Sequence, residues 1–273
     1  MSEGPPIDEL LPVRNVFSLC NRPPWALAAQ TFQDSPCPLH IGRVRDSNHR
    51  LFHLLDAQDD PIRRGEIFHE YLSVLFSLHH WNDGLGDHAR RILRNSYVRF
   101  LRGWQTDSNS MEGAVLKGWV HSRMGLCPTF HHVPLATDPQ ATAVYAIDRL
   151  KGCSRTNAID SQLDLLYEFC QYELSRRFPG EQWHTLYRGT YDAATYRLVA
   201  DDDPKAPVVC MNNMSSFTSD RECAWEFGST VWEVRIPCSK IFCFSGLLPD
   251  SLLHGENEYL VIGGEYRVHR LLH

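Results

Sequence analysis

Two glutamates, Glu256 and Glu258, stand two residues apart at the start of the apolar stretch "EYLVIGGEY" near the end of the chain. On a β-strand, residues i and i+2 point to the same face, so these carboxylates would be neighbours of like charge. Such a pair loses stability unless a cation or a hydrogen-bond donor compensates the charge. It suits a reaction in which one carboxylate stabilises a cation-like transition state and the other orients a polar nucleophile. The alternative is a strand end whose acids simply face water.

An arginine followed by a glycine ends an earlier predicted strand, in "LYRGT" at residues 186–190. The guanidinium of Arg188 can form two parallel hydrogen bonds to a phosphate. Gly189 has no side chain, so a ligand can approach its backbone closely. The alternative is a surface arginine paired with an acid.

A third segment, "NNMSSFTSDRECAWEF", places a cluster of hydroxyl groups between the other two segments. Its hydroxyl residues are Ser215, Ser216, Thr218 and Ser219. Residues of this kind often form turns or helix caps. We therefore expect Ser219 or Asp220 to cap a short helix after the strand.

The elements that must position these residues divide the chain into a helical part and a later β-rich part. The first fifty or so residues are rich in Pro, Asn and Asp and predict a loop-dominated lead-in that wraps over the rest. Apolar residues at helical spacing predict helices within residues 61–81, 88–104 and 111–125. In the first of these helices the buried residues are expected to be Ile67, Tyr71, Val74, Leu75 and Leu78. In the second, arginines surround an apolar side, and this face is either solvated or docks an acidic partner.

The β-rich part follows one more helix. That helix is expected to open at Asp160 or Ser161, where "SQLD" is similar to a capping box, and to end before the Pro-Gly pair at 179–180. Short β-branched and aromatic runs separated by Gly, Pro and Asp then predict strands. They lie at residues 183–189, 208–214, 230–237 and 240–246, with one or two more at 257–272.

In this order, and within a β-rich region, the three segments resemble the Arg-Ser-Glu signature of ADP-ribosyltransferases related to the cholera and iota toxins. The matching residues are Arg188 in "YRG", Ser216 at the start of "SFT", and Glu256 and Glu258 in "ENE". Thr218 is a departure, because many members have Ser there. The two-glutamate form is associated with arginine as the acceptor of ADP-ribose.

The resemblance implies a role for each matching residue. Glu258 would stabilise the charge that develops on the ribose of NAD, and Ser216 would hold Glu258. Arg188 would bind the NAD phosphates, while Glu256 would orient the acceptor guanidinium and take its proton. Phe227, eleven residues after Ser216, would stack on the nicotinamide. The implied NAD-binding residues are Arg188, Gly189, Thr190, Asn213, Ser216, Thr218, Phe227 and Glu258.

Over the whole chain, the size, the helical first half and the three segments are similar to the dinitrogenase reductase ADP-ribosyltransferases, a bacterial family. Membership would imply NAD as co-substrate and an arginine of the nitrogenase iron protein as acceptor, so that modification switches nitrogen fixation off. It would also imply a PII-type nitrogen-signalling protein as activator. The fold expected is α+β, with a lead-in and helical subdomain for partner recognition over residues 1–155. A mixed β-sandwich ADP-ribosyltransferase core would follow over residues 156–273.

The composition is that of a soluble protein, with a net charge of −6 over 273 residues. This charge provides no overall attraction to nucleic acid or to an anionic membrane. Nine scattered cysteines without a CxxC pair predict free thiols in a reducing cytoplasm. The N-terminal residues include early acids and no long apolar run, so neither a signal peptide nor a membrane anchor is expected.

Two other functions remain as alternatives to the transferase. One is a catalytically silent, NAD-responsive regulatory protein with the same fold, and the other is a Cys/His hydrolase, although no cysteine lies in a known nucleophile motif. We expect no metal site. Histidines cluster at residues 79–88 and at 131–132, but neither group has a carboxylate or cysteine at a typical ligand interval.

Overall fold

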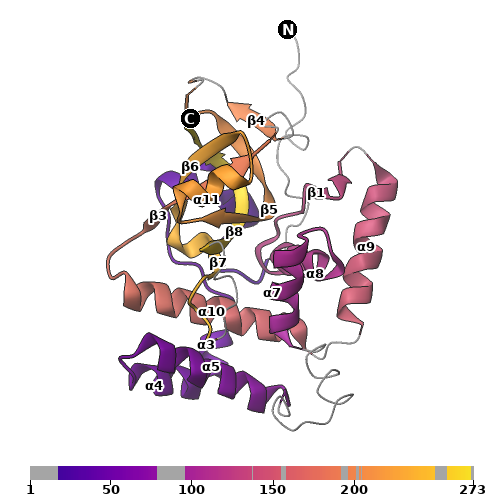
Figure 1. The fold of residues 1–273 in the computed structure, drawn as a ribbon. Coiled ribbons are helices and arrows are strands. Elements are labelled where there is room, and N and C mark those ends of the chain that lie inside the picture. The colour runs from indigo at the N-terminus through magenta and orange to yellow at the C-terminus, as the bar shows by residue number, and fades with distance from the viewer. Residues whose placement is uncertain are drawn as a thin grey trace.

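The chain combines helices in its first half with an antiparallel sheet in its second half, which confirms the α+β class (Figure 1). The structure is a computed structural model. It describes residues 18–78, 96–136, 138–154, 158–191, 196–200, 203, 205–249 and 257–271.

The helices before the large sheet are α1 (Pro24–Ala28), α2 (Gln30–Asp34), α3 (Val44–Ser47), α4 (His49–Asp56), α5 (Pro61–Leu75), α7 (Tyr97–Thr106), α8 (Met111–Met124), α9 (Pro139–Cys153) and α10 (Ile159–Arg177). A two-stranded ribbon of β1 (Phe130–His131) and β2 (Val133–Pro134) lies between α8 and α9. Side-chain caps fix several of these helix ends. Asp60 accepts a hydrogen bond from the Ile62 N–H at the start of α5, and Ser110 accepts one from Gly113 at the start of α8. The left-handed Gly125 ends α8.

The long helix α10 lies between the sheet and the pair α4–α5 (Figure 1). Its buried acids bind arginines from the N-terminal helical region. Arg45 is 2.6 Å from Glu168 and Arg64 is 2.5 Å from Glu173, and Arg123 is 2.7 Å from Asp164. Because a buried carboxylate is costly without a partner, these pairs fix the N-terminal helices to α10.

The large sheet has seven strands in the order β7-β8-β5-β3-β6-β9, with β4 also paired to β5. Its strands are β3 (Trp183–Thr190), β4 (Arg197–Ala200), β5 (Val208–Thr218), β6 (Thr230–Pro237), β7 (Ile241–Phe244), β8 (Glu258–Arg267) and β9 (His269–Leu271), with α11 (Arg221–Glu226) after β5 and the 3₁₀ turn η3 (Cys238–Lys240) after β6. Every pair between described strands is antiparallel, so the expectation of a mixed sheet was wrong. A single residue pair, Tyr187 with Thr218, joins β3 to β5. The sandwich arrangement stays a prediction.

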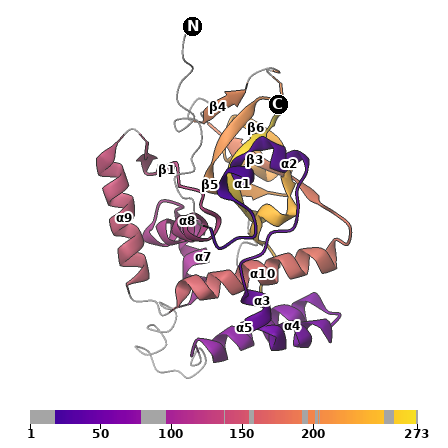
Figure 2. The ribbon, with the colours of Figure 1, turned by 180° about the vertical axis from the view of Figure 1, so that it is seen from behind.

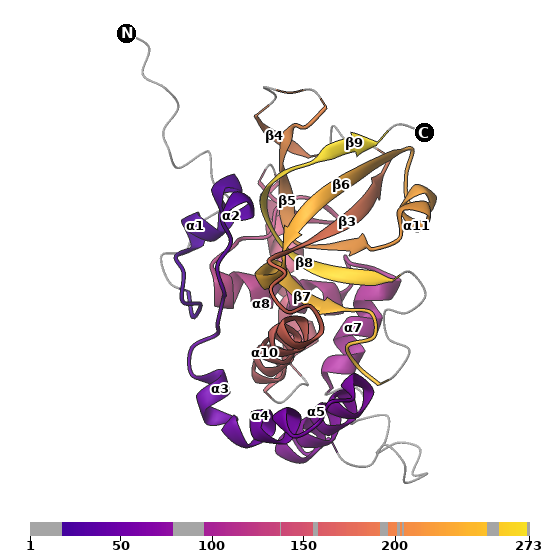
Figure 3. The same cartoon turned by 90° about the vertical axis from the view of Figure 1, so that its left-hand side faces the viewer.

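The lead-in lies against the sheet, as Figures 2 and 3 show for α1 and α2. Lys240 Nζ donates to Leu27 O at 2.6 Å and to Gly263 O at 2.7 Å, which joins α1 to β8. The Gln33 side chain bonds both the N–H and the carbonyl of Arg267. The lead-in therefore wraps over the sheet as predicted, but it contains short helices where little regular structure was expected.

The start of α10 differs from the prediction, because tertiary contacts bind a side chain that was expected to form the cap. The residue before the helix, Ala158, has a φ of 55° and no side-chain cap, so the predicted capping box at Asp160 or Ser161 was wrong. Asp164, its expected fourth residue, instead accepts hydrogen bonds from Arg123 and Trp119. The helix does end before the Pro-Gly pair, as predicted.

The buried side of α5 also differs from the prediction. Phe68 and Leu72 are fully buried, whereas Val74 is 65% and Leu75 is 50% exposed. In α7 the prediction is confirmed for the described residues, because Tyr97, Phe100, Leu101 and Trp104 are all buried.

One hydrophobic core extends across the predicted boundary at residue 155. It includes Phe68 and Trp119 from the helical half and Trp232 and Ile262 from the sheet. All nine cysteines lie within the described residues, and none of them forms a disulfide bond. None of the described helices has the length and apolar character needed to span a membrane.

Candidate active site

Ser216 and Glu258 lie on the paired strands β5 and β8, where β8 begins. Thr218 is directly opposite Glu258, and Ser216 opposite Leu260, so Ser216 and Glu258 are diagonal neighbours on one face. Ser216 Oγ donates a hydrogen bond of 2.5 Å to Glu258 Oε1. Glu258 is only 4% exposed, so its carboxylate is held in a mostly dry position beside this hydroxyl.

Arg188 lies on β3 and reaches the same strand end. Its Nη1 donates to Ser216 O at 2.5 Å, and its Nε donates to Tyr196 Oη at 3.0 Å. Its Cζ lies 5.9 Å from the centre of the Phe217 ring. No carboxylate within the described residues forms an ion pair with Arg188, so its charge remains available to an anionic ligand.

The helix α11 closes the other side of the site. Asp220 caps it by accepting hydrogen bonds from Glu222 N and Cys223 N, so the cap is Asp220 and not Ser219. A Cβ on Gly189 would lie 2.0 Å from Ala224 O, so glycine is required here by the approach of α11 to β3. At the end of α11, Phe227 is 44% exposed, an unusual surface position for an aromatic ring.

These side chains line one pocket of about 230 Å³. Its lining consists of Tyr187, Arg188, Gly189, Ser216, Phe217, Thr218, Ala224, Phe227 and Glu258. The volume is below the roughly 300–1,000 Å³ of pockets that enclose a whole drug-sized ligand. A pocket of this size has room for one part of a large ligand, and the remainder of such a ligand would extend over the surface.

Two of the predicted residues that the structure describes, Asn213 and Thr190, do not line this pocket. Asn213 is 2% exposed, and its Nδ2 donates to Lys117 O and Leu126 O, so the side chain points towards the end of α8. Thr190 follows the pocket-lining Gly189, and its backbone lies directly against Gly228. Glu256 falls outside the described residues, so its predicted role stays a prediction.

Other residues at the site were not predicted. Tyr187 and Phe217 are sequence neighbours of Arg188 and Ser216, so the signature segments already pointed to them. Trp104 is different, because it lies on α7, far away in the sequence. Its Nε1 donates to Ser216 Oγ at 2.8 Å, and nothing in the helical pattern around it indicates such a contact.

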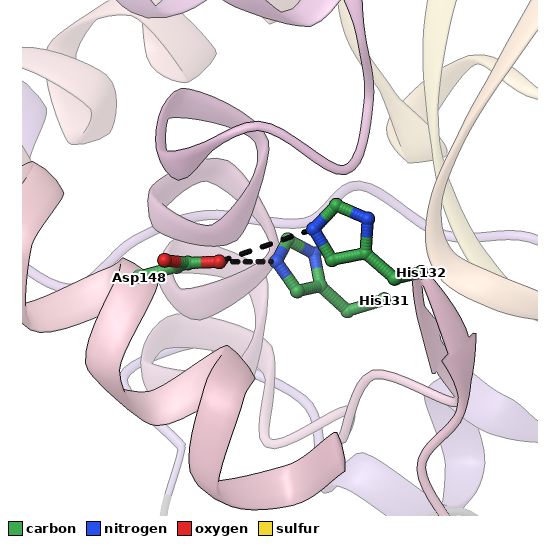
Figure 4. A group of neighbouring side chains, drawn as sticks. All are labelled: His131, His132 and Asp148. Atoms are coloured by element: carbon green, nitrogen blue, oxygen red, sulfur yellow. Dashed lines mark hydrogen bonds and ion pairs between the residues drawn. The ribbon is translucent and has the colours of Figure 1, made fainter.

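A second cluster, at the ribbon β1–β2, joins two histidines to an acid from α9 (Figure 4). His131 Nε2 is 3.3 Å and His132 Nε2 is 4.0 Å from Asp148 Oδ2. The sequence interval did not reveal this carboxylate, because folding alone brings it near. On its other side, His131 Nδ1 is 3.4 Å from Lys117 Nζ. A lysine that donates to Nδ1 leaves the imidazole proton on Nε2, where it bonds Asp148 and competes with metal binding.

The sequence model of the family described as "Dinitrogenase reductase ADP-ribosyltransferase (DRAT)" matches residues 17–270. The chain belongs to this family. A protein of Rhodospirillum rubrum named "NAD(+)--dinitrogen-reductase ADP-D-ribosyltransferase" is 42% identical to it over 257 residues, which cover 92% of this chain and 93% of the relative. No solved structure matches the chain. The family match includes both the signature strands and most of the helical half, so the two parts belong to one family architecture.

Proposed function

We propose that the chain transfers ADP-ribose from NAD to an arginine side chain of dinitrogenase reductase, releases nicotinamide and thereby switches off nitrogen fixation. The observation that supports this most is the 2.5 Å hydrogen bond between Ser216 and Glu258 inside a pocket that also contains Arg188 and Phe227. A buried carboxylate, an available guanidinium and an exposed aromatic ring suit the reactive end of NAD. The R. rubrum relative is named for the same donor and the same target protein.

Each group in the pocket suits a different part of NAD. The guanidinium of Arg188 suits the phosphates, because it is positively charged and has no carboxylate partner among the described residues. The exposed ring of Phe227 suits the flat face of the nicotinamide. The carboxylate of Glu258 would then face the ribose.

In the reaction, the bond between the ribose C1 atom and the nicotinamide nitrogen breaks, and its electron pair leaves with nicotinamide. Positive charge develops on the ribose, and the fixed negative charge of Glu258 stabilises it. Preorganisation is what makes this effective, since the carboxylate does not need to reorient when the charge appears. The hydroxyl of Ser216 supplies that preorganisation.

The acceptor step needs a second carboxylate. A guanidinium nitrogen is cationic and a poor nucleophile until it loses a proton. Glu256, two residues before Glu258, is our proposed acceptor for that proton as the new bond from nitrogen to the ribose C1 atom forms. Arginine is therefore the proposed acceptor residue, and the transfer is that of a glycosyl group.

We also propose binding partners, a division of the chain into two parts and a cellular compartment. The dinitrogenase reductase would dock over the pocket, and a PII-type signalling protein would act as activator through the helical half, residues 1–155. The catalytic core would be residues 156–273, NAD would be the co-substrate, and no metal would take part. The reaction would take place in the cytoplasm.

The test uses NAD labelled in its adenylate part, the full chain and purified dinitrogenase reductase. The proposal predicts one labelled protein of the size of dinitrogenase reductase, with the label on an arginine-containing peptide. A silent NAD-binding regulator would bind the labelled NAD and leave every protein unlabelled. Label on a residue other than arginine would retain the transferase but overturn the acceptor.

A further inference from the structure

The indole of Trp104 contacts the catalytic pair from the helical half of the chain. Its Nε1 lies 2.8 Å from Ser216 Oγ, and Ser216 Oγ lies 2.5 Å from Glu258 Oε1. The three groups therefore form a continuous hydrogen-bonded series from α7 to β5 to β8. Trp104 is only 3% exposed, so water does not compete for its N–H.

The direction of these two hydrogen bonds follows from chemistry. An indole N–H can only donate, whereas a serine hydroxyl has one proton to donate and can also accept. Because Trp104 occupies an acceptor position of Ser216, the hydroxyl proton of Ser216 points to Glu258 and not to α7. The indole thus fixes the orientation of the hydroxyl that holds the carboxylate.

The position of Trp104 is itself fixed by its surroundings. The Ser96 hydroxyl caps α7, and the ammonium of Lys117 lies 5.9 Å from the centre of the Trp104 ring. Lys117 Nζ also donates to Phe130 O at 3.0 Å and to Asn109 Oδ1 at 3.2 Å, so α8 and the loops beside it hold the cation over the indole. A cation over the ring face favours this ring orientation.

We propose that Trp104 is a positioning residue for catalysis, which orders Ser216 and through it Glu258, so that the helical half contributes directly to the active site. This inference rests on the proposed function, since it assigns Glu258 to the reaction. Trp104 does not line the pocket, and its effect is expected on the rate of bond breaking and not on NAD binding.

The kinetic test compares Trp104→Phe with wild type in nicotinamide release from NAD. Phenylalanine retains an aromatic ring but removes the N–H donor together with part of the volume of the indole. The lost hydrogen bond should lower kcat about tenfold, with KM for NAD within about twofold. In a Ser216→Ala background the same change should have no further effect, because the indole acts through Ser216. An equal loss in both backgrounds would overturn the proposal.

Trp119→Phe is the matched control. Trp119 is also fully buried, and its Nε1 donates to Asp164 at 2.8 Å, away from the pocket. This variant loses an indole donor of the same kind and should retain wild-type kcat. If it loses as much activity as Trp104→Phe, the effect is one of general packing and the proposal fails.

A second measurement does not depend on activity or on the folding of the tryptophan variants. In full-length protein with ¹⁵N-labelled tryptophan, Ser216→Ala should shift the indole N–H resonance of Trp104 and leave that of Trp119 in place. An unmoved Trp104 resonance would overturn the inferred contact. If wild type releases no nicotinamide but this shift is seen, the proposed function fails while the Trp104 contact holds.

Discussion

Ser216 Oγ and Glu258 Oε1 are 2.5 Å apart across the β5–β8 pair, and they are diagonal neighbours rather than directly opposite residues. This contact depends on the register of the two strands. A slip of one residue in either strand would turn one of the two side chains to the opposite face of the sheet. Long pairing between β5 and β8 maintains this register.

Ser216→Ala removes the hydroxyl that holds Glu258. We expect kcat for nicotinamide release to fall about 10- to 100-fold, because the carboxylate at the developing charge is no longer held in place, while KM for NAD changes little. Ser215→Ala is the matched control, since successive residues of a strand point to opposite faces and Ser215 does not line the pocket. Loss of NAD affinity without loss of kcat would show that Ser216 acts in binding only.

Arg188→Lys retains the positive charge and removes the planar group that bonds Ser216 O and Tyr196 Oη together. A lysine ammonium cannot form these two hydrogen bonds in the same geometry, and it cannot bind a phosphate through two parallel hydrogen bonds. KM for NAD should rise about tenfold or more, with a smaller change in kcat. The measurement is steady-state kinetics over a range of NAD concentrations. An unchanged KM would show that Arg188 does not bind the NAD phosphates.

Glu256→Gln separates the two halves of the proposed reaction. Removing the proton acceptor should reduce transfer to dinitrogenase reductase at least tenfold, while hydrolysis of NAD by water continues at nearly the wild-type rate. The two rates are measured in parallel as labelled protein and as nicotinamide released without acceptor protein. An equal loss in both would contradict the division of work between Glu256 and Glu258.

Lys240 should make the stability of the fold depend on pH. Burial lowers the pKa of this lysine from 10.5 to about 7. Between these values the unfolded chain binds a proton that the folded chain lacks, so the free energy of unfolding should increase with pH. The slope is at most about 1.4 kcal/mol per pH unit.

Lys240→Met removes this titration and, with it, two hydrogen bonds to the carbonyls of Leu27 and Gly263. The variant should be less stable, yet its stability should increase less steeply than that of wild type between pH 7 and pH 9. Urea unfolding at both pH values provides the comparison. If the free energy of unfolding changes equally with pH in the two proteins, Lys240 remains protonated in the folded state.

Much of the β-rich half follows from local patterns in the sequence. The predicted strand at 230–237 has the bounds of β6, and Asp220 is a cap because its side chain reaches N–H groups two and three residues later. Arg188, Ser216 and Glu258 meet because β3, β5 and β8 belong to one sheet, in which the ends of β3 and β5 lie beside the start of β8. The resemblance of the three ordered segments to the Arg-Ser-Glu signature indicated that meeting.

The side-chain contacts that were not predicted share a physical cause. In each case the side chain binds a partner that is distant in the sequence. Asp164 has the spacing of a capping residue, but Arg123 and Trp119 bind it instead. Trp104 lies at an ordinary core position of α7, and the sequence contains no sign that its N–H faces Ser216. Asn213 has the expected interval from Ser216, yet the bulge in β5 turns its amide towards α8.

Glu258→Gln provides the most direct test of the central claim, that this pocket breaks the bond between nicotinamide and ribose. Glutamine retains the shape and a hydrogen-bonding oxygen for Ser216, but it removes the negative charge. With NAD binding and thermal stability measured on the same sample, we expect near-wild-type NAD affinity and at least a 100-fold loss of both nicotinamide release and transfer. A folded Glu258→Gln variant that binds NAD and still releases nicotinamide at the wild-type rate would contradict it.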